Sequence, residues 1–214
     1  MPQIVETTVY ELHELSDAAK EHARAWFREN AGDLDWYDVI YDDFAEVCRI
    51  LGIELRTYPL RLMGGGARQK PCIWFSGFSS QGDGACFEGV YSYQKGAARR
   101  IREYAPQDEE LHRIAGRLFD VQRANFFQLR ADIRHRGRYC HAYCMVIAVE
   151  RGSPAYQNMT DGAQDAVTDC LRDLANWLYR RLENEWDYLM SDETVDEGIT
   201  ANGYTFTERG RRFG

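Results

Sequence analysis

Two short polar stretches of the chain contain side chains that could carry out acid–base chemistry. Asp83 lies in the glycine-rich stretch 80–84, and His135 and His141 lie in or beside a later arginine-rich stretch. A carboxylate paired with an imidazole can act as a general acid and base, and Gln81 or the backbone N–H groups of the flanking glycines could hold an anion. Asp83, His135 and His141 are therefore the catalytic candidates. The alternative, which we favour, is a tight turn in which Asp83 bonds its own backbone.

The arginine-rich stretch itself could bind an anionic ligand. Arg134, Arg136 and Arg138 alternate along it and Tyr139 follows, while three further arginines lie in residues 99–102. Planar guanidinium groups suit phosphate and carboxylate ligands, and an exposed aromatic ring can stack on a base. The alternative is a hairpin tip whose charges only keep it hydrated. The predicted ligand-binding set is Gln81, Asp83, Arg134, Arg136, Arg138 and Tyr139.

The cysteines suggest a metal site that strand geometry argues against. Cys140, His141 and Cys144 are close in sequence, with His135 nearby. On a strand, residues four apart are separated by about 13 Å and adjacent residues face opposite sides, whereas zinc holds its ligands at about 2.0 to 2.3 Å. Only a helix or bulge would bring them together, so we expect buried thiols and no metal. With no secretory segment, all six cysteines are expected to be free: Cys48, Cys72, Cys86, Cys140, Cys144 and Cys170.

An acidic stripe runs along a predicted helix that ends before Gly52. Its apolar residues repeat with a helical period, and Asp35, Asp38, Asp42 and Glu46 lie on the other side. Such a stripe could bind a basic partner, so these four residues are the predicted partner-binding set. The alternative is the solvated face of an ordinary surface helix.

The charge distribution limits the class of partner. The net charge is -8, with residues 1–50 contributing -8 and residues 93–138 contributing +5. An acidic molecule with a basic middle is not expected to coat nucleic acid, but it can contain a local anion site. No triad spacing, Walker motif or Cys-x-x-Cys pair occurs, so the sequence favours a non-enzyme without a cofactor.

Local patterns predict the elements. Helices are expected from residue 17 to 29, 36 to 51, 96 to 104, 108 to 125, 163 to 190 and 194 to 202, and strands at 55–63, 72–78, 85–91, 127–133, 141–150 and 204–207, with 64–70 as a loop. Strands interrupted irregularly by helices favour an α+β fold with an antiparallel sheet of about four to five strands, several helices and a long C-terminal helix. We expect one domain over residues 1–214, located in the cytosol and without a membrane span.

Several stretches resemble those of an uncharacterised family of bacteriophage and prophage proteins. The signature Phe-Ser-Ser-Gln-Gly-Asp-Gly-Ala-Cys-Phe-Glu-Gly, residues 78–89, is the most specific. Residues 14–20, the break at 104–106, the hairpin 136–141 and residues 187–189 are similar too, so the resemblance spans nearly the whole chain.

The resemblance implies a phage context and no known reaction. Small accessory phage proteins often bind and inhibit a host protein complex. The expected function is therefore an anti-defence, anti-CRISPR-like inhibitor that acts in the host cytosol by binding. The alternative is a nucleotide-binding or oligonucleotide-binding protein, or a small phosphodiester-directed enzyme, that uses the turn at Asp83 and the arginine-rich hairpin. The oligomeric state is left open.

Overall fold

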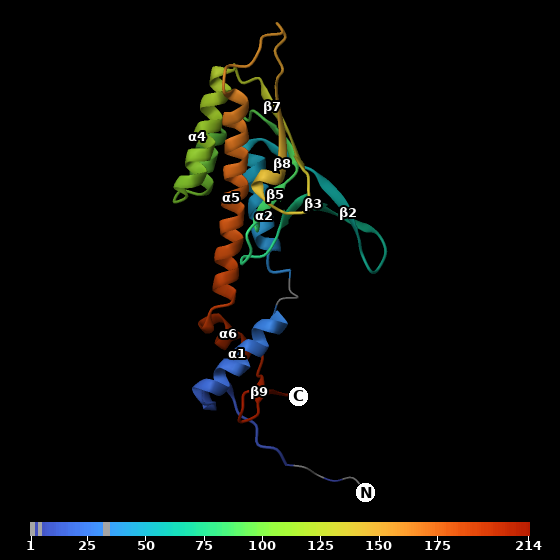
Figure 1. The fold of residues 1–214 in the computed structure, drawn as a ribbon, viewed down its shortest axis with the longest axis vertical. Helices are drawn as coiled ribbons and strands as arrows, with labels where there is room; N and C mark the ends of the chain where they lie inside the picture. Colours follow the sequence, from blue (N-terminus) through green and yellow to red (C-terminus); the bar gives the residue numbers. More distant parts are fainter. Residues whose placement is uncertain (1–2, 4–5, 32–34) are drawn as a thin grey trace. The chain divides into compact units, whose positions relative to one another are not determined.

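The computed structural model describes residues 3, 6–31 and 35–214, and the chain divides into two compact units (Figure 1). One unit comprises residues 37–182, and the other comprises residues 1–36 together with 183–214. The expectation of a single domain over the whole chain stays a prediction. The two units are described separately below.

The larger unit is built on a four-stranded antiparallel sheet with the strand order β1-β6-β7-β8. Its strands are β1 (Ile53–Leu55), β6 (Gly89–Ser92), β7 (Leu129–His135) and β8 (Met145–Arg151). Alternate residues of β7, such as Ala131 and Ile133, are fully buried, whereas Arg130 and Arg134 on either side of this pair are exposed. This period of two gives the sheet one apolar and one solvated face.

Two hairpins meet at one corner of this sheet. They contain β2 (Thr57–Arg61), β3 (Ala67–Pro71), β4 (Ile73–Phe75) and β5 (Ala85–Phe87), and β2 pairs with β3 and β4 with β5. At the corner Arg56 N donates to Glu88 O (2.9 Å), Cys72 N to Arg56 O (2.7 Å), and Glu88 N to Cys72 O (2.9 Å). The backbones of Arg56, Cys72 and Glu88 thus close a ring of hydrogen bonds, in which each residue is bonded to both of the others.

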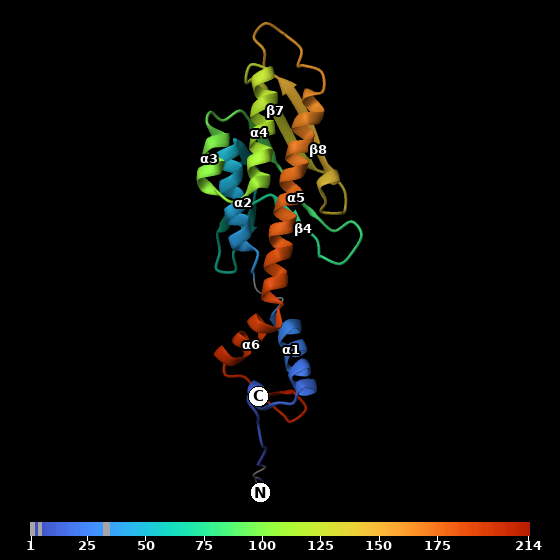
Figure 2. The same cartoon turned by 90° about the vertical axis from the view of Figure 1, so that its left-hand side faces the viewer.

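Helices cover the apolar face of the sheet (Figure 2). They are α2 (Asp38–Leu51), α3 (Ala97–Tyr104), α4 (Glu109–Ala124) and the long α5 (Ala163–Leu189). Phe44 of α2 lies against Phe87 and Trp177, with ring centres 5.2 and 6.4 Å away. Because Phe44 and Phe87 are fully buried, these rings join helix, strand and helix into one core.

A buried amide joins α4 to the sheet. Gln122 is fully buried, its Nε2 donates to Leu129 O (2.8 Å), and its Oε1 accepts from Leu129 N (3.1 Å). The side chain therefore pairs both backbone groups of a strand residue, as a neighbouring strand would.

The smaller unit packs α1 (Asp17–Ala31) against α6 (Asp192–Ala201). It also contains the short helix η1 (Leu12–Glu14) and the strands β9 (Thr205–Phe206) and β10 (Arg212–Phe213). Its buried residues are Leu12, Leu15, Ala19, Ala23, Val195, Ile199 and Phe206.

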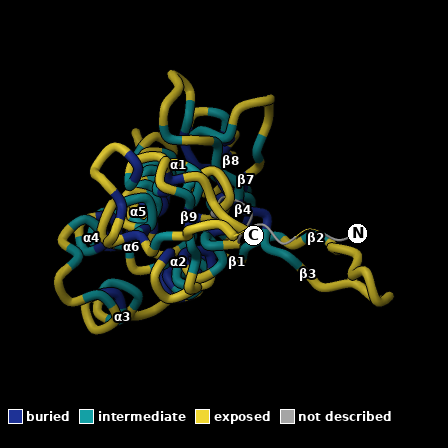
Figure 3. Tube along the Cα trace, turned by 90° about the horizontal axis from the view of Figure 1, so that it is seen from below, coloured by how far each residue is buried: buried dark blue, intermediate teal, exposed yellow. Residues whose placement is uncertain are grey.

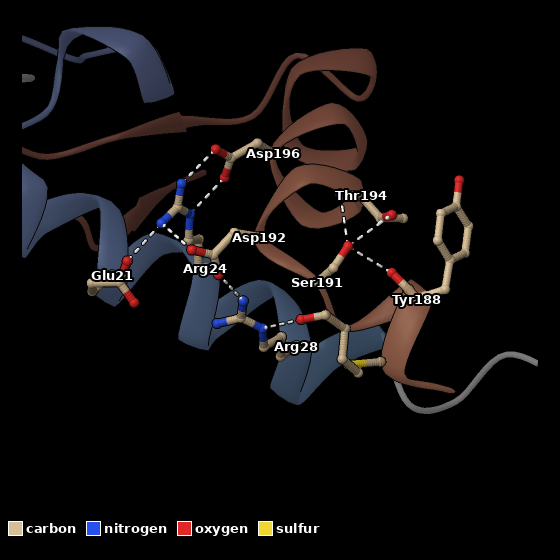
Figure 4. Close-up of polar contacts among 9 residues, drawn as sticks. Glu21, Arg24, Arg28, Tyr188, Ser191, Asp192, Thr194 and Asp196 are labelled. Atoms are coloured by element: carbon tan, nitrogen blue, oxygen red, sulfur yellow. Dashed lines mark hydrogen bonds and ion pairs between the residues drawn. The ribbon is translucent and has the colours of Figure 1, made fainter. Parts of the chain in front are cut away.

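An ion-pair network lies beside that core (Figure 4). Arg24 donates from Nε and Nη2 to both carboxylate oxygens of Asp196, at 2.7 and 2.6 Å, and from Nη1 to Glu21 and Asp192. Arg28 donates to Asp192 and to the carbonyl oxygen of Met190. A paired fork of this kind is a specific contact, and it connects α1 to α6.

The predicted fold class is confirmed, since the sheet is antiparallel, four-stranded and packed with several helices that include α5. Several local predictions are wrong. The strand expected at 55–63 is divided between β1 and β2, and the strand expected at 127–133 is β7, which begins at Leu129 and continues to His135. Residues 67–70, expected in a loop, belong to β3, and the strand expected from residue 141 begins only at Met145, after the short helix η2 (Ala142–Cys144). Within the described residues, no helix combines the length and apolarity that a bilayer span requires.

Candidate functional site

Asp83 uses its carboxylate to hold its own loop. Its Oδ2 accepts hydrogen bonds from Ser79 N at 2.9 Å and Ser80 N at 2.6 Å, while Asp83 N donates to Ser80 O at 3.0 Å. The turn interpretation therefore describes the side chain, and neither imidazole hydrogen-bonds to this carboxylate in the described part of the chain. Gln81 lies exposed in the same turn.

The loop between β4 and β5, residues 76–84, contains the first part of the signature and is called the signature loop here; it is anchored at both of its ends. At one end Tyr179 of α5 donates from its hydroxyl to Gly77 O (3.0 Å), and its ring lies 5.5 Å from that of Phe78. At the other end Gly84 is buried against the arginine-rich hairpin, where a Cβ atom would come within 2.9 Å of His141 Cδ2 and 3.1 Å of Cys140 O. The two turns singled out in the sequence are therefore neighbours in space, and only glycine fits between them.

The two histidines stabilise the hairpin that contains them. His135 Nε2 donates to Tyr139 O (3.0 Å), and its ring lies 5.6 Å from that of Trp74. His141 Nδ1 accepts from Tyr143 N (3.1 Å), and the His141 and Tyr143 rings stack at 5.4 Å. Each ring therefore has one nitrogen engaged in local structure, and neither ring hydrogen-bonds to Asp83 within the described residues.

The arginines of the predicted ligand set differ in their environments. Arg134 Nε donates to Asp132 Oδ2 (3.0 Å), and Arg56 donates to the other oxygen of the same carboxylate (2.5 Å). The hydrogen bond from Arg134 is the largest factor that holds the pKa of Asp132 below its usual range, and the hydrogen bond from Arg56 acts in the same direction. Arg136 and Arg138 are exposed and form no salt bridge with any described residue, and Tyr139 is 60% exposed.

An open pocket of about 560 Å³ is lined by Arg56 and Arg134, at the corner where Arg56, Cys72 and Glu88 form their ring of hydrogen bonds. Glu54, Cys72 and Glu88 line it together with Arg56 and Arg134. Its wall is therefore of mixed charge.

The cysteines expected to be free are free. Cys86 shares a side-chain hydrogen bond with Cys140, close to Cys144. Burial raises the pKa of both Cys86 and Cys140, which keeps them as unreactive thiols. Although η2 supplies a helical turn at Cys144, no group of three potential ligands among the described residues is arranged to hold a metal ion.

The acidic stripe is partly neutralised by nearby bases. Asp38 lies 3.8 Å from Lys70, and Glu46 pairs with Arg49 at 2.5 Å, which lowers the pKa of Glu46. Asp42 is exposed and has no basic partner among the described residues, and Asp35 is exposed just before α2. The stripe therefore presents less free charge than the sequence implies.

An acidic pocket that the sequence did not predict lies on the other flank of α2. It has a volume of about 680 Å³ and is lined by α2, the turn between α3 and α4, and α5. The lining residues are Asp43, Val47, Tyr104, Ala105, Pro106, Gln107, Asp108, Glu109, Leu111, Trp177 and Arg181. Three carboxylates, one guanidinium and several apolar side chains therefore line it.

Hydrogen bonds make the walls of this acidic pocket rigid. Tyr104 donates its hydroxyl proton to Asp43 Oδ1 (2.6 Å), which raises the pKa of Tyr104 to about 12. Asp108 accepts from Trp177 Nε1 (2.7 Å) and from Leu111 N (2.9 Å). The sequence predicted a helix from residue 108, but nothing local could indicate that Trp177, 69 residues later, would meet Asp108.

The pocket can hold a cation and an apolar group together. Glu109 is exposed and forms no salt bridge with a described residue, so its charge is available to a ligand. Arg181 instead lies over the Trp177 ring, 5.9 Å from its centre. A basic and apolar segment of another protein has the complementary chemistry.

Comparison with known proteins identifies the family. No curated protein and no solved structure matches the chain. A family profile described as a domain of unknown function (DUF8835) matches residues 36–192. That range contains the acidic pocket, the signature loop and the arginine-rich hairpin, and it covers most of the 214 residues. The chain therefore belongs to the DUF8835 family of domains of unknown function.

Proposed function

We propose that this chain is a phage-derived accessory protein that binds a host protein complex in the cytosol and inhibits it. The observation that carries the proposal is the acidic pocket, whose free carboxylate at Glu109 and apolar wall at Trp177 suit a basic, apolar segment. Asp42 lies exposed on the adjacent face of α2, next in sequence to Asp43 in the pocket wall. Together they extend the acidic surface beyond the pocket.

Binding without catalysis accounts for the groups that first suggested an enzyme. Asp83 closes its own loop, and the two imidazoles hold the neighbouring hairpin. A general base must reach the proton that it removes. Because these groups already serve the loops that contain them, inhibition by occupation of a surface needs fewer assumptions than a reaction.

The test uses charge reversal in bacteria that contain a nuclease-based defence system. Cells that express the chain should allow a sensitive phage to plate at least about tenfold better, because the inhibited defence complex no longer stops infection. Asp42→Lys combined with Glu109→Lys should abolish that gain, because both changes place positive charge where a basic surface docks. Glu150→Lys, which makes at an exposed position of β8 the same charge change as either single substitution, is the control.

Affinity purification of the same three proteins, followed by quantitative mass spectrometry of isotope-labelled lysates, should recover one host complex with the wild type and Glu150→Lys only. Two results together would contradict the proposal. The wild type would leave phage plating unchanged in all the defence systems tried, and no complex would be recovered with the wild type that is missing with the double variant.

A second candidate function is the binding of a nucleotide or oligonucleotide. It is favoured by one observation, the close approach of Gly84 to Cys140 and His141, which packs the signature turn against the hairpin that carries the exposed Arg136 and Arg138. Guanidinium groups without a protein partner can take a phosphate, and Tyr139 could stack on a base. Nucleotides and short oligonucleotides should then raise the melting temperature. Arg138→Ala should remove the shift and Arg123→Ala should not; no shift with any ligand would exclude this function.

A further inference from the structure

The β2–β3 hairpin forms an exposed arm, residues 57–71 (Figure 3). Every residue from Pro59 to Gln69 is exposed, in contrast to the buried strands at its base. The tip contains Leu60, Leu62 and Met63, which are 44%, 50% and 108% exposed. Apolar side chains gathered on an exposed tip mark an interaction surface.

The arm holds its shape because its base is fixed. An isolated two-stranded hairpin is marginally stable in water, but this one leads directly into the ring of hydrogen bonds at Arg56, Cys72 and Glu88. Tyr58 also stacks on Trp74, with ring centres 6.5 Å apart and planes 13° apart. An arm held in this way loses little conformational entropy when it docks.

The arm is basic as well as apolar. Residues 55–82 contain no aspartate or glutamate but include Arg56, Arg61, Arg68 and Lys70, in a chain of net charge -8. Arg61 and Arg68 are exposed and form no salt bridge within the described ranges, whereas Lys70 approaches Asp38. The tip therefore offers arginine next to leucine and methionine.

The acidic pocket has the complementary composition. Asp43, Asp108 and Glu109 supply negative charge, and Trp177, Leu111 and Val47 are among its apolar lining. The pocket is open in the same chain whose arm is exposed. Both features lie within residues 36–192, which the family profile matches.

We propose that the arm of one copy of this chain inserts its tip into the acidic pocket of a second copy. Arg61 meets Glu109 there, and Leu62 and Met63 cover the apolar wall that Trp177 provides. This inference rests on the proposed function, in which the pocket binds a basic, apolar segment. It identifies the arm of a second copy as such a segment. A host segment would then compete with the arm for one site.

Reciprocal insertion makes two identical contacts in a closed dimer. The second insertion is intramolecular once the first has formed, which multiplies the affinity of two weak contacts. A one-way insertion would leave a free arm and a free pocket at the ends and would generate longer chains. Sedimentation velocity distinguishes a dimer from such a series.

The experiment measures self-association of the purified full chain at concentrations from about 1 to 100 µM. The wild type should show a concentration-dependent dimer. Arg61→Glu and Glu109→Arg should each raise the dissociation constant at least about tenfold, because each places like charges across the contact. The double variant Arg61→Glu/Glu109→Arg should return toward the wild-type value, since the reversed arm meets a reversed pocket.

One control and one further variant keep the result specific. Arg123→Glu makes the same charge change at an exposed position of α4 that is in neither surface, so the dimer should persist. Met63→Ser removes apolar surface from a fully exposed side chain, so it should weaken the dimer without affecting the fold. Circular dichroism of each variant confirms folding.

A wild type that stays monomeric throughout this range overturns the inference, as does a double variant that is no better than either single one. Binding of a labelled DNA duplex to the wild type and to Arg61→Glu tests whether the arm binds nucleic acid instead. If Arg61→Glu reduces duplex binding and leaves sedimentation unchanged, the arm serves nucleic acid and the inference is wrong. Because no host extract is used, failure here is separate from failure of the plating test.

Discussion

At the scale of single residues, the signature turn is explained by the bonds that close it. Asp83 accepts from two backbone N–H groups, and Gly84 allows the turn to touch His141. The residue types in this motif are those that a tight turn and a close approach require. Their presence is therefore accounted for without a reaction.

Replacing Asp83 with alanine should destabilise the larger unit by about 1 to 2 kcal/mol, because two backbone donors lose their charged acceptor in a partly exposed loop. Urea unfolding followed by circular dichroism measures the change. Gln81→Ala, in the same turn but exposed, serves as the control and should leave the midpoint unchanged. An Asp83→Ala protein as stable as the wild type would show that the loop does not depend on this carboxylate.

Gly84→Ala should cost about 1 to 3 kcal/mol, since a Cβ atom would approach the backbone of Cys140 and His141 and the hairpin would have to move. Gly77→Ala is the matched substitution in the same loop, because its nearest contact would be an ordinary 3.4 Å to Asp83 Oδ2. Thermal melts of the two variants should separate clearly. Equal melting temperatures would mean that the two turns are not packed together.

At the scale of elements, polar side chains join helices to their neighbours. Gln122 attaches α4 to β7, and Arg24 attaches α1 to α6. One pair is buried in the core, and the other lies at the surface with Asp196 34% exposed. The two connections should therefore respond to different conditions.

Gln122→Leu should lower the free energy of unfolding by about 3 kcal/mol, because the buried N–H and C=O of Leu129 would both lose their partners. Gln164→Leu makes the same change at an exposed position of α5 and should be nearly neutral. Equilibrium urea titration distinguishes them. A neutral Gln122→Leu would imply that water or another group replaces the amide.

The α1–α6 connection should weaken in acid. The hydrogen bond from Arg24, more than any other factor, holds the pKa of Asp196 below its ordinary 3.8. A lowered folded-state pKa contributes stability that is fully present above the unfolded value and is lost as pH falls through the folded value. NMR signals of α1 amides should therefore report loosening below about pH 4. Asp196→Asn should be less stable at neutral pH and show a shallower acid transition; an identical transition would contradict the assignment.

At the scale of the whole molecule, the division into two compact units coincides closely with the family match. The larger unit covers residues 37–182 and the profile covers 36–192, which includes all of α5. The acidic pocket, the arm and both turns lie in this part.

A fragment of residues 36–192 should therefore fold by itself, since it retains the four-stranded sheet and the helices that bury its apolar face. We expect one cooperative urea transition and the amide-exchange pattern that these residues have in the full chain. A fragment that unfolds without cooperativity would show that residues of the smaller unit are needed for its stability.

The sequence alone determined the elements whose signals are local. The predicted helices at 96–104, 108–125 and 163–190 match α3, α4 and α5 to within one residue at each end, because caps, proline and helical periodicity act over a few residues. The irregular order of strands and helices likewise indicated an antiparallel sheet.

Tertiary structure alone decided which distant groups meet. The strand β3 is polar and lies beside a glycine-rich loop, so only its pairing with β2 makes it a strand. The acidic pocket brings together α2, the α3–α4 turn and Trp177 of α5. Such contacts depend on how whole elements pack, and no short stretch of sequence encodes them.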